Sequence, residues 1–106
     1  MKRISIMEDF NISARDVDKY IYDENTIIVD LRSAEEYMEY HIKNSVNFPE
    51  DSIFDRLYVL DKYKLIILYC DRGVNSLIVA KRLKGMNYNV KSVVGGFNFY
   101  RQSHKR

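Results

Sequence analysis

Two short apolar runs limit the folds that are open to this chain of 106 residues. TIIVDL (26–31) and KLIILYC (64–70) are apolar almost throughout and rich in β-branched and aliphatic side chains. Such a run is typical of a strand buried on both faces, as in a parallel sheet that helices cover on both sides. Helical patterns precede, separate and follow the two runs. The sequence therefore predicts an α/β fold, a small parallel β-sheet flanked by helices on both faces.

The rest of the chain supplies elements that alternate around these two strands. Ser13 is a candidate N-cap, and Ser33 three residues before Glu36 forms a capping box. One proline and four glycines leave little room for a domain boundary, so residues 1–106 are predicted to form a single domain. We expect helices at 13–22, 33–40, 51–60, 74–88 and 97–103, and further strands at 3–7, 45–48 and 90–96.

Composition and charge argue against several classes of protein. No apolar run approaches the ~20 residues of a membrane-spanning helix, and the N-terminal stretch has no signal-peptide pattern. The net charge of +2 is too small to argue for a nucleic-acid partner. One cysteine cannot form an internal disulfide and suits a reducing compartment. We therefore expect a cytoplasmic protein with no membrane or nucleic-acid partner. No metal or cofactor is expected, because one cysteine with His41 and His104 lacks any ligand spacing.

The single cysteine, Cys70, stands where a buried strand ends and a helix begins. Ligand sites of parallel sheets form at the carboxyl ends of the strands. A helix N-terminus offers unpaired N–H groups and a positive dipole end, which favour a thiolate, the nucleophilic form of cysteine. The other reading, a buried structural cysteine, stays open at this point.

The segment that follows, here called the Cys70 loop (residues 70–76), has the composition of an anion site. Gly73 allows a strained backbone that turns N–H groups toward the sulfur, and Arg72 can bind an anionic substrate. Asn75 and Ser76 add small polar groups. We predict Cys70 as the nucleophile, and the substrate-binding residues as Asp71, Arg72, Gly73, Val74, Asn75 and Ser76.

Three stretches in order resemble the rhodanese-like domain family. VDLRSAEEYMEYHIKNSVNFP (29–49) resembles its N-terminal signature, and VVGGFNFY (93–100) resembles its C-terminal Gly-Gly-aromatic turn. YCDRGVNS lies between them, where the family carries its active-site loop. The matches span residues 27–100. The residues of the first signature are Asp30, Arg32, Glu36, Tyr37, His41, Ile42, Asn47 and Pro49.

The resemblance implies sulfur transfer through a persulfide on the loop cysteine. The expected donor is thiosulfate, a persulfide or a polysulfide, and the expected acceptor is a thiol, cyanide or a protein. The chain departs from the family at three places. Tyr40 replaces the usual glycine, Tyr100 stands where many members have tryptophan, and Arg72 is the only arginine of the loop. The third departure weakens the case for thiosulfate.

Two other functions remain as alternatives. One is a non-catalytic binding or regulatory module with the same fold. The other is a cysteine phosphatase, which would need an arginine six positions after the cysteine to hold phosphate, where this chain has Ser76. Asp30 and Arg32 are expected to form a structural ion pair, and His41 is expected to bond the backbone of its own connection.

Overall fold

The computed structural model describes residues 10–104, and the strand predicted at 3–7 lies outside this range. Five strands form one sheet in the order β1-β5-β4-β2-β3, and every neighbouring pair is parallel. The strands are β1 (Asn11–Ile12), β2 (Thr26–Asp30), β3 (Val46–Asn47), β4 (Leu65–Tyr69) and β5 (Val90–Val93). The predicted parallel α/β fold is confirmed.

The two apolar runs form the centre of this sheet. β2 and β4 pair along their whole length, from Thr26 opposite Leu65 to Asp30 opposite Tyr69. All of β2 is buried, and so is β4 beyond Leu65. Side chains alternate between the two faces of a strand. Ile27 therefore contacts one hydrophobic cluster, and Ile28 contacts the other.

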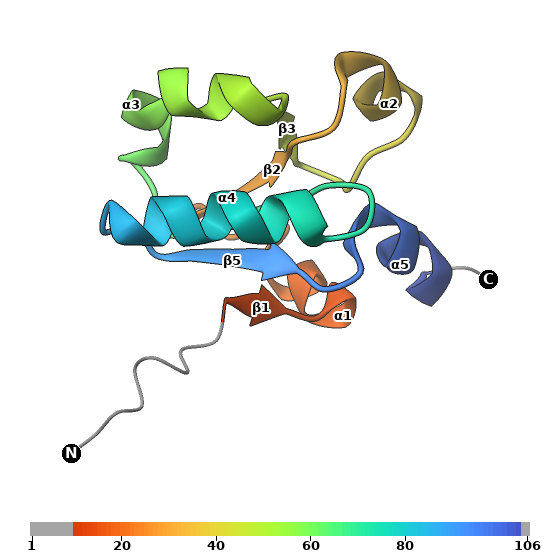
Figure 1. Ribbon diagram of the computed structural model, residues 1–106. Coiled ribbons are helices and arrows are strands. Elements are labelled where there is room, and N and C mark those ends of the chain that lie inside the picture. Colours follow the sequence, from red (N-terminus) through yellow and green to blue (C-terminus); the bar gives the residue numbers. More distant parts are fainter. Residues whose placement is uncertain (1–9, 105–106) are drawn as a thin grey trace.

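Helices cover both faces of the sheet (Figure 1). One cluster packs α4 (Val74–Gly85) and α3 (Leu57–Leu60) on the sheet through buried residues such as Leu60 and Leu83. The other packs α1 (Ala14–Val17) and α5 (Gly96–Ser103) on the opposite face through Val17 and Phe97. Among the described residues, no helix is both long and apolar enough to span a bilayer.

Two predicted helices are shorter or more irregular than the sequence suggested. The helix at 13–22 is α1, capped by Ser13, followed by the 3₁₀ turn η2 (Asp18–Tyr20). The helix at 51–60 is the 3₁₀ segment η3 (Glu50–Asp55) followed by α3. Arg56 separates the last two, because its φ of −119° and ψ of 23° are not helical.

The remaining helices lie close to their predicted positions. α2 (Ala34–Glu39) begins with the capping box, since Ser33 Oγ accepts from the Glu36 N–H while the Glu36 carboxylate accepts from the Ser33 N–H. α4 ends at Gly85 rather than at 88. Asn87 has a φ of 73°, and this left-handed residue turns the chain out of the helix.

Candidate active site

Cys70 lies at the carboxyl end of β4, directly before the start of α4 at Val74. The thiol is buried, with 6% of the residue exposed. Only three residues separate Cys70 from the helix, so Asn75 and Ser76 of the Cys70 loop already belong to the first helical turn. The strand end and the helix start are thus as close together as the sequence suggested.

Backbone N–H groups point at the sulfur of Cys70. The N–H of Gly73 donates to Sγ at 3.2 Å, and the N–H of Ser76 donates at 3.3 Å. The hydroxyl oxygen of Ser76 lies 3.5 Å from the same sulfur. Two donors at the start of a helix form a cradle for negative charge.

Glycines fix the shape of this cradle. Gly73 has a φ of 96°, and a Cβ there would lie 3.1 Å from the Gly95 nitrogen and 3.2 Å from the Val93 oxygen. The Gly-Gly turn before α5 then holds the Cys70 loop from the other side. The N–H of Phe97 donates to the Cys70 carbonyl at 2.8 Å, and the N–H of Asn98 donates to the Asp71 carbonyl at 3.0 Å. The C-terminal signature therefore contacts the Cys70 loop directly.

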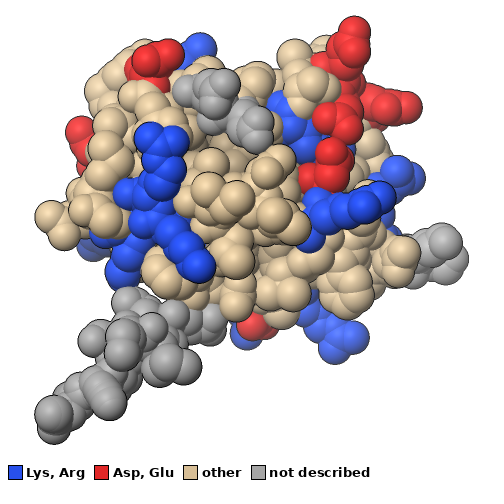
Figure 2. All heavy atoms as spheres, viewed as in Figure 1, with Lys and Arg blue, Asp and Glu red and all other residues tan. Residues whose placement is uncertain are grey.

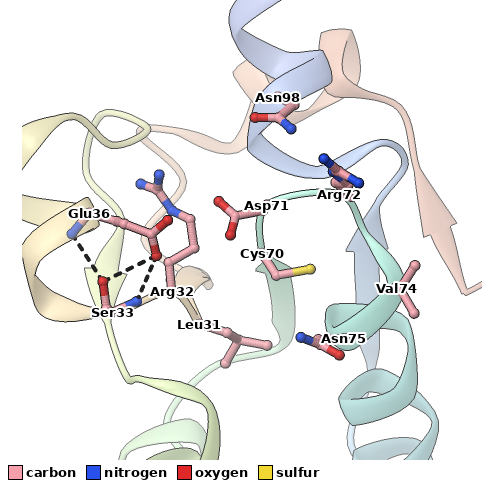
Figure 3. A pocket seen from close by; sticks show the side chains of 10 residues that line it. All are labelled: Leu31, Arg32, Ser33, Glu36, Cys70, Asp71, Arg72, Val74, Asn75 and Asn98. Atoms are coloured by element: carbon pink, nitrogen blue, oxygen red, sulfur yellow. Dashed lines mark hydrogen bonds between the residues drawn. The ribbon is translucent and has the colours of Figure 1, made fainter.

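A cavity of about 560 Å³ opens beside the thiol (Figure 3). It lies between the β2–α2 connection, the Cys70 loop and α5. Four of the six predicted substrate-binding residues line it, whereas Gly73 and Ser76 contact the sulfur through their N–H groups instead. The lining consists of Leu31, Arg32, Ser33, Glu36, Cys70, Asp71, Arg72, Val74, Asn75 and Asn98.

Five of the lining residues were not among the predicted site residues: Leu31, Arg32, Ser33, Glu36 and Asn98. The first four follow β2, the strand beside β4. Parallel strands end at one edge of a sheet, so these residues lie next to Cys70 because β2 is the neighbour of β4, an order that the sequence did not predict. Asn98 lies on α5, and no signal in the sequence places its side chain at the cavity.

The predicted ion pair of Asp30 and Arg32 is confirmed. Arg32 donates through Nε and Nη2 to the buried Asp30 carboxylate, with Nη2 2.8 Å from Oδ2. Burial works against the charge of Arg32, but the bonds to Asp30 and its negative charge raise the arginine pKa. Nη2 also donates to the Tyr40 carbonyl at 2.6 Å. Arg32 therefore ties the end of β2 to the connection after α2 while facing the cavity.

The mouth of the cavity carries acidic as well as basic groups. Partial burial raises the pKa of Asp71, and the nearby Glu36 carboxylate raises it further, whereas Arg32 lowers it. Arg72 is exposed on the same cavity wall. Figure 2 shows acidic side chains gathered over α2 and basic side chains beside them toward α5. An anionic substrate that enters the cavity would thus meet charges of both signs.

The scan of protein families matches the rhodanese-like domain over residues 13–103. The chain belongs to the rhodanese-like domain family. Its relatives include thiosulfate sulfurtransferase GlpE from Coxiella burnetii, 30% identical over 74% of this chain and 74% of that protein. Another is the tRNA sulfurtransferase of Thermoplasma acidophilum, 34% identical over 79% of this chain but only 20% of that protein. This chain thus spans about three quarters of GlpE but only about a fifth of the tRNA sulfurtransferase.

A solved structure agrees with the fold of this rhodanese-like domain. Protein BH2092 from Bacillus halodurans matches with a TM-score of 0.79 and 28% identity, over 92% of this chain and 75% of that chain.

The two histidines of this rhodanese-like domain lie apart from the thiol cavity. His41 stacks on Tyr37, and its Nδ1 lies 2.6 Å from the Tyr37 carbonyl oxygen, so the predicted backbone bond is confirmed. His104 lies beyond α5 and pairs with Asp18 at 2.6 Å. Within residues 10–104, no three His, Cys, Asp or Glu side chains are grouped as metal ligands.

Proposed function

We propose that this protein is a sulfurtransferase that carries a sulfane sulfur on Cys70. The Cys70 thiolate attacks the outer sulfur of a donor such as thiosulfate. The donor S–S bond breaks, its electron pair leaves with sulfite, and a new S–S bond joins the outer sulfur to Sγ. A thiolate or cyanide then attacks that outer sulfur, and Cys70 leaves as a thiolate.

The observation that carries this proposal is the pair of N–H groups on Sγ. The Gly73 and Ser76 N–H donors lie within 3.3 Å of the sulfur, where they can stabilise negative charge that develops on it during the transfer. Preorganised donors of this kind need no rearrangement when the charge develops. A merely structural cysteine would not need a cavity of about 560 Å³ at its side.

Geometry speaks against the phosphatase alternative. A phosphatase of this design needs an arginine at the position of Ser76, whose side chain would clamp the phosphate. Ser76 is fully buried, and its hydroxyl lies 2.6 Å from Ser92 Oγ. No cation can reach the cradle from that position.

The choice of donor and acceptor is a second part of the proposal. Arg72 is the cation of the Cys70 loop, but Asp71 and Glu36 on the same cavity wall oppose a dianion such as thiosulfate. We infer that an organic persulfide or organic polysulfide, which carries less negative charge at its sulfurs, is used more readily than thiosulfate, with a small thiol or a protein as acceptor. A cytoplasmic location remains the expectation from the single cysteine.

A single-turnover experiment tests the function. The protein is mixed with thiosulfate or with a polysulfide, desalted, and measured by intact mass spectrometry. We expect a gain of about 32 Da, one sulfur, that is lost when cyanide is added. Cys70→Ser is the matched control and should gain no mass. Absence of the gain with both donors would favour the non-catalytic module instead.

A further inference from the structure

A second cavity, of about 750 Å³, lies between the connection after α2 and helix α5. Its size falls within the roughly 300–1,000 Å³ of small-molecule sites. No part of the proposed sulfur chemistry uses it. It is lined by Tyr40, His41, Lys43, Phe97, Asn98, Tyr100, Arg101, Gln102 and His104.

The charged groups of this second cavity favour an anion. Lys43 and Arg101 are its permanent cations, and no carboxylate is among the lining residues. A hydrogen bond to Tyr22 raises the pKa of Lys43. The nearby carboxylate of Asp18 already accepts from the Tyr100 hydroxyl at 2.9 Å and pairs with His104. Neither Lys43 nor Arg101 is paired with the Asp18 carboxylate.

The same cavity presents aromatic faces. Tyr40 is 57% exposed, and the Arg101 guanidinium lies 4.8 Å from the centre of its ring. Phe97 meets the Tyr40 ring edge-on at 5.9 Å and stacks with Tyr100 at 6.3 Å. Phe97 is buried and Tyr100 partly buried, so the exposed surface is the Tyr40 ring with the guanidinium plane beside it, and these are groups on which a flat heterocycle can stack.

Tyr40 is also a departure of this chain from the family pattern, which has glycine at that position. The backbone does not explain the change, because Tyr40 has an extended φ of −169° that any residue adopts. With glycine there, the cavity would lose one aromatic wall and the partner of Arg101. Tyr100, another departure, lines the same cavity. Two of this chain's differences from its family therefore lie at one place.

The second cavity lies close to the surroundings of the thiol. A third cavity of about 460 Å³ lies between them and shares lining residues with both. Asn98 lines all three. A molecule held by Arg101 and Tyr40 would therefore lie beside the entrance to Cys70.

We propose that the second cavity binds a molecule that combines a flat heterocycle with phosphate, as a nucleoside diphosphate does. The ring stacks on Tyr40 and the Arg101 plane, and the phosphates lie between Arg101 and Lys43. Binding depends on these side chains alone and does not require sulfur transfer. The same chemistry is present in single-stranded RNA, so the test separates the free nucleotide from the polymer.

Calorimetric titration of the full chain with ADP tests the proposal, with adenosine and inorganic phosphate as partial ligands. ADP should bind saturably and at least tenfold more tightly than either part. Arg101→Gln and Lys43→Gln should each weaken ADP binding about tenfold, because each removes one charge-assisted contact. Lys62→Gln, at an exposed lysine outside the cavity lining, is the matched control and should change nothing.

Variants of Tyr40 test the ring separately. Tyr40→Gly restores the family residue and should weaken ADP about tenfold, whereas Tyr40→Phe keeps the ring and should bind as the parent does. Circular dichroism melting checks that each variant is folded. Absence of saturable ADP binding, or equal losses in Lys62→Gln, would overturn the proposal. Tighter binding of a single-stranded RNA through the same residues would assign the site to nucleic acid and overturn the small-molecule reading.

Discussion

Replacing Gly96 by alanine should damage both the stability and the activity of this domain. Gly96 has a φ of 62°, and an added Cβ would lie 2.5 Å from the Asp71 oxygen and 2.6 Å from the Cys70 oxygen. Both are backbone atoms, so no side chain can swing away to make room. The Gly-Gly turn and the Cys70 loop would have to move apart by roughly 1 Å to reach ordinary contact distance.

The cost of Gly96→Ala can be estimated from two sources. A left-handed conformation costs a residue with a Cβ about 1–2 kcal/mol. Separation of the segments also weakens the bonds from Phe97 N–H to Cys70 and from Asn98 N–H to Asp71, each worth about 0.5–1.5 kcal/mol. The free energy of unfolding should therefore fall by about 2–5 kcal/mol, and Tm by at least ~8 °C. A displacement of 1 Å at the nucleophile can cost about 100-fold in kcat/KM.

Gly85→Ala is the matched control for this experiment. No atom lies within 4 Å of the position of its Cβ, and its φ is not left-handed. Alanine is the better helix former, so Gly85→Ala should leave stability unchanged or raise it by up to about 1 kcal/mol. Thermal melting and thiosulfate–cyanide kinetics measure both variants. If Gly96→Ala melts and reacts like Gly85→Ala, the close approach of the two segments does not position the thiol.

The remaining predictions concern the thiol and the charges around it. Cys70→Ser should abolish persulfide formation in the mass assay while its melting curve stays near that of the parent, because a hydroxyl fits the cradle but cannot hold a sulfane sulfur. Arg72→Ala should raise the thiosulfate KM about ten- to a hundredfold with little change in kcat if its side chain binds the donor; an unchanged kcat/KM would remove it from the site. Arg32→Ala leaves the buried Asp30 charge unpaired and should cost about 3–5 kcal/mol in denaturant unfolding. The raised pKa of Asp71 means that its carboxyl group becomes neutral at a higher pH than an ordinary aspartate. The repulsion of thiosulfate is then removed, so the thiosulfate KM should fall as the pH falls. Asp71→Asn should lose this pH dependence of KM.

Much of the fold follows from local sequence patterns. The continuous apolar runs of β2 and β4 can be buried on both faces only if helices cover the sheet on both sides. This places the two strands at the centre of a parallel sheet. The capping box of Ser33 and Glu36 marks the start of α2 to the residue. Such features are predictable because neighbours in the sequence supply all the atoms involved.

Irregular segments were harder to predict, because packing decides them. Ile53 is fully buried in η3 and Leu60 in α3, so a single straight helix over 51–60 looks reasonable from its apolar spacing. The chain instead breaks at Arg56 into two short segments that each bury their own residue. No local pattern distinguishes these two solutions.

The position of Cys70 at the start of a helix was predictable, but most of the cavity around it was not. The end of β4 and the start of α4 are adjacent in sequence, so the contact of Cys70 with the N–H groups of Gly73 and Ser76 is local. Glu36 illustrates the other case. Its capping role is visible in the sequence, but its place beside Asp71 depends on how α2 packs next to the Cys70 loop.

The placement of charge in the site indicates what the domain is built to stabilise. Among the described residues, the donors aimed directly at the Cys70 sulfur are the N–H groups of Gly73 and Ser76, whereas the Ser76 hydroxyl oxygen accepts from the thiol. The cavity wall is different, since Arg72 is opposed there by Asp71 and Glu36. The backbone N–H donors are fixed by the fold. The charged side chains of the cavity wall, in contrast, can be changed by single substitutions that leave the fold intact. The cradle therefore supports the proposed role of Cys70 as a sulfur carrier, and we expect the charges of the cavity wall to decide which donor is used.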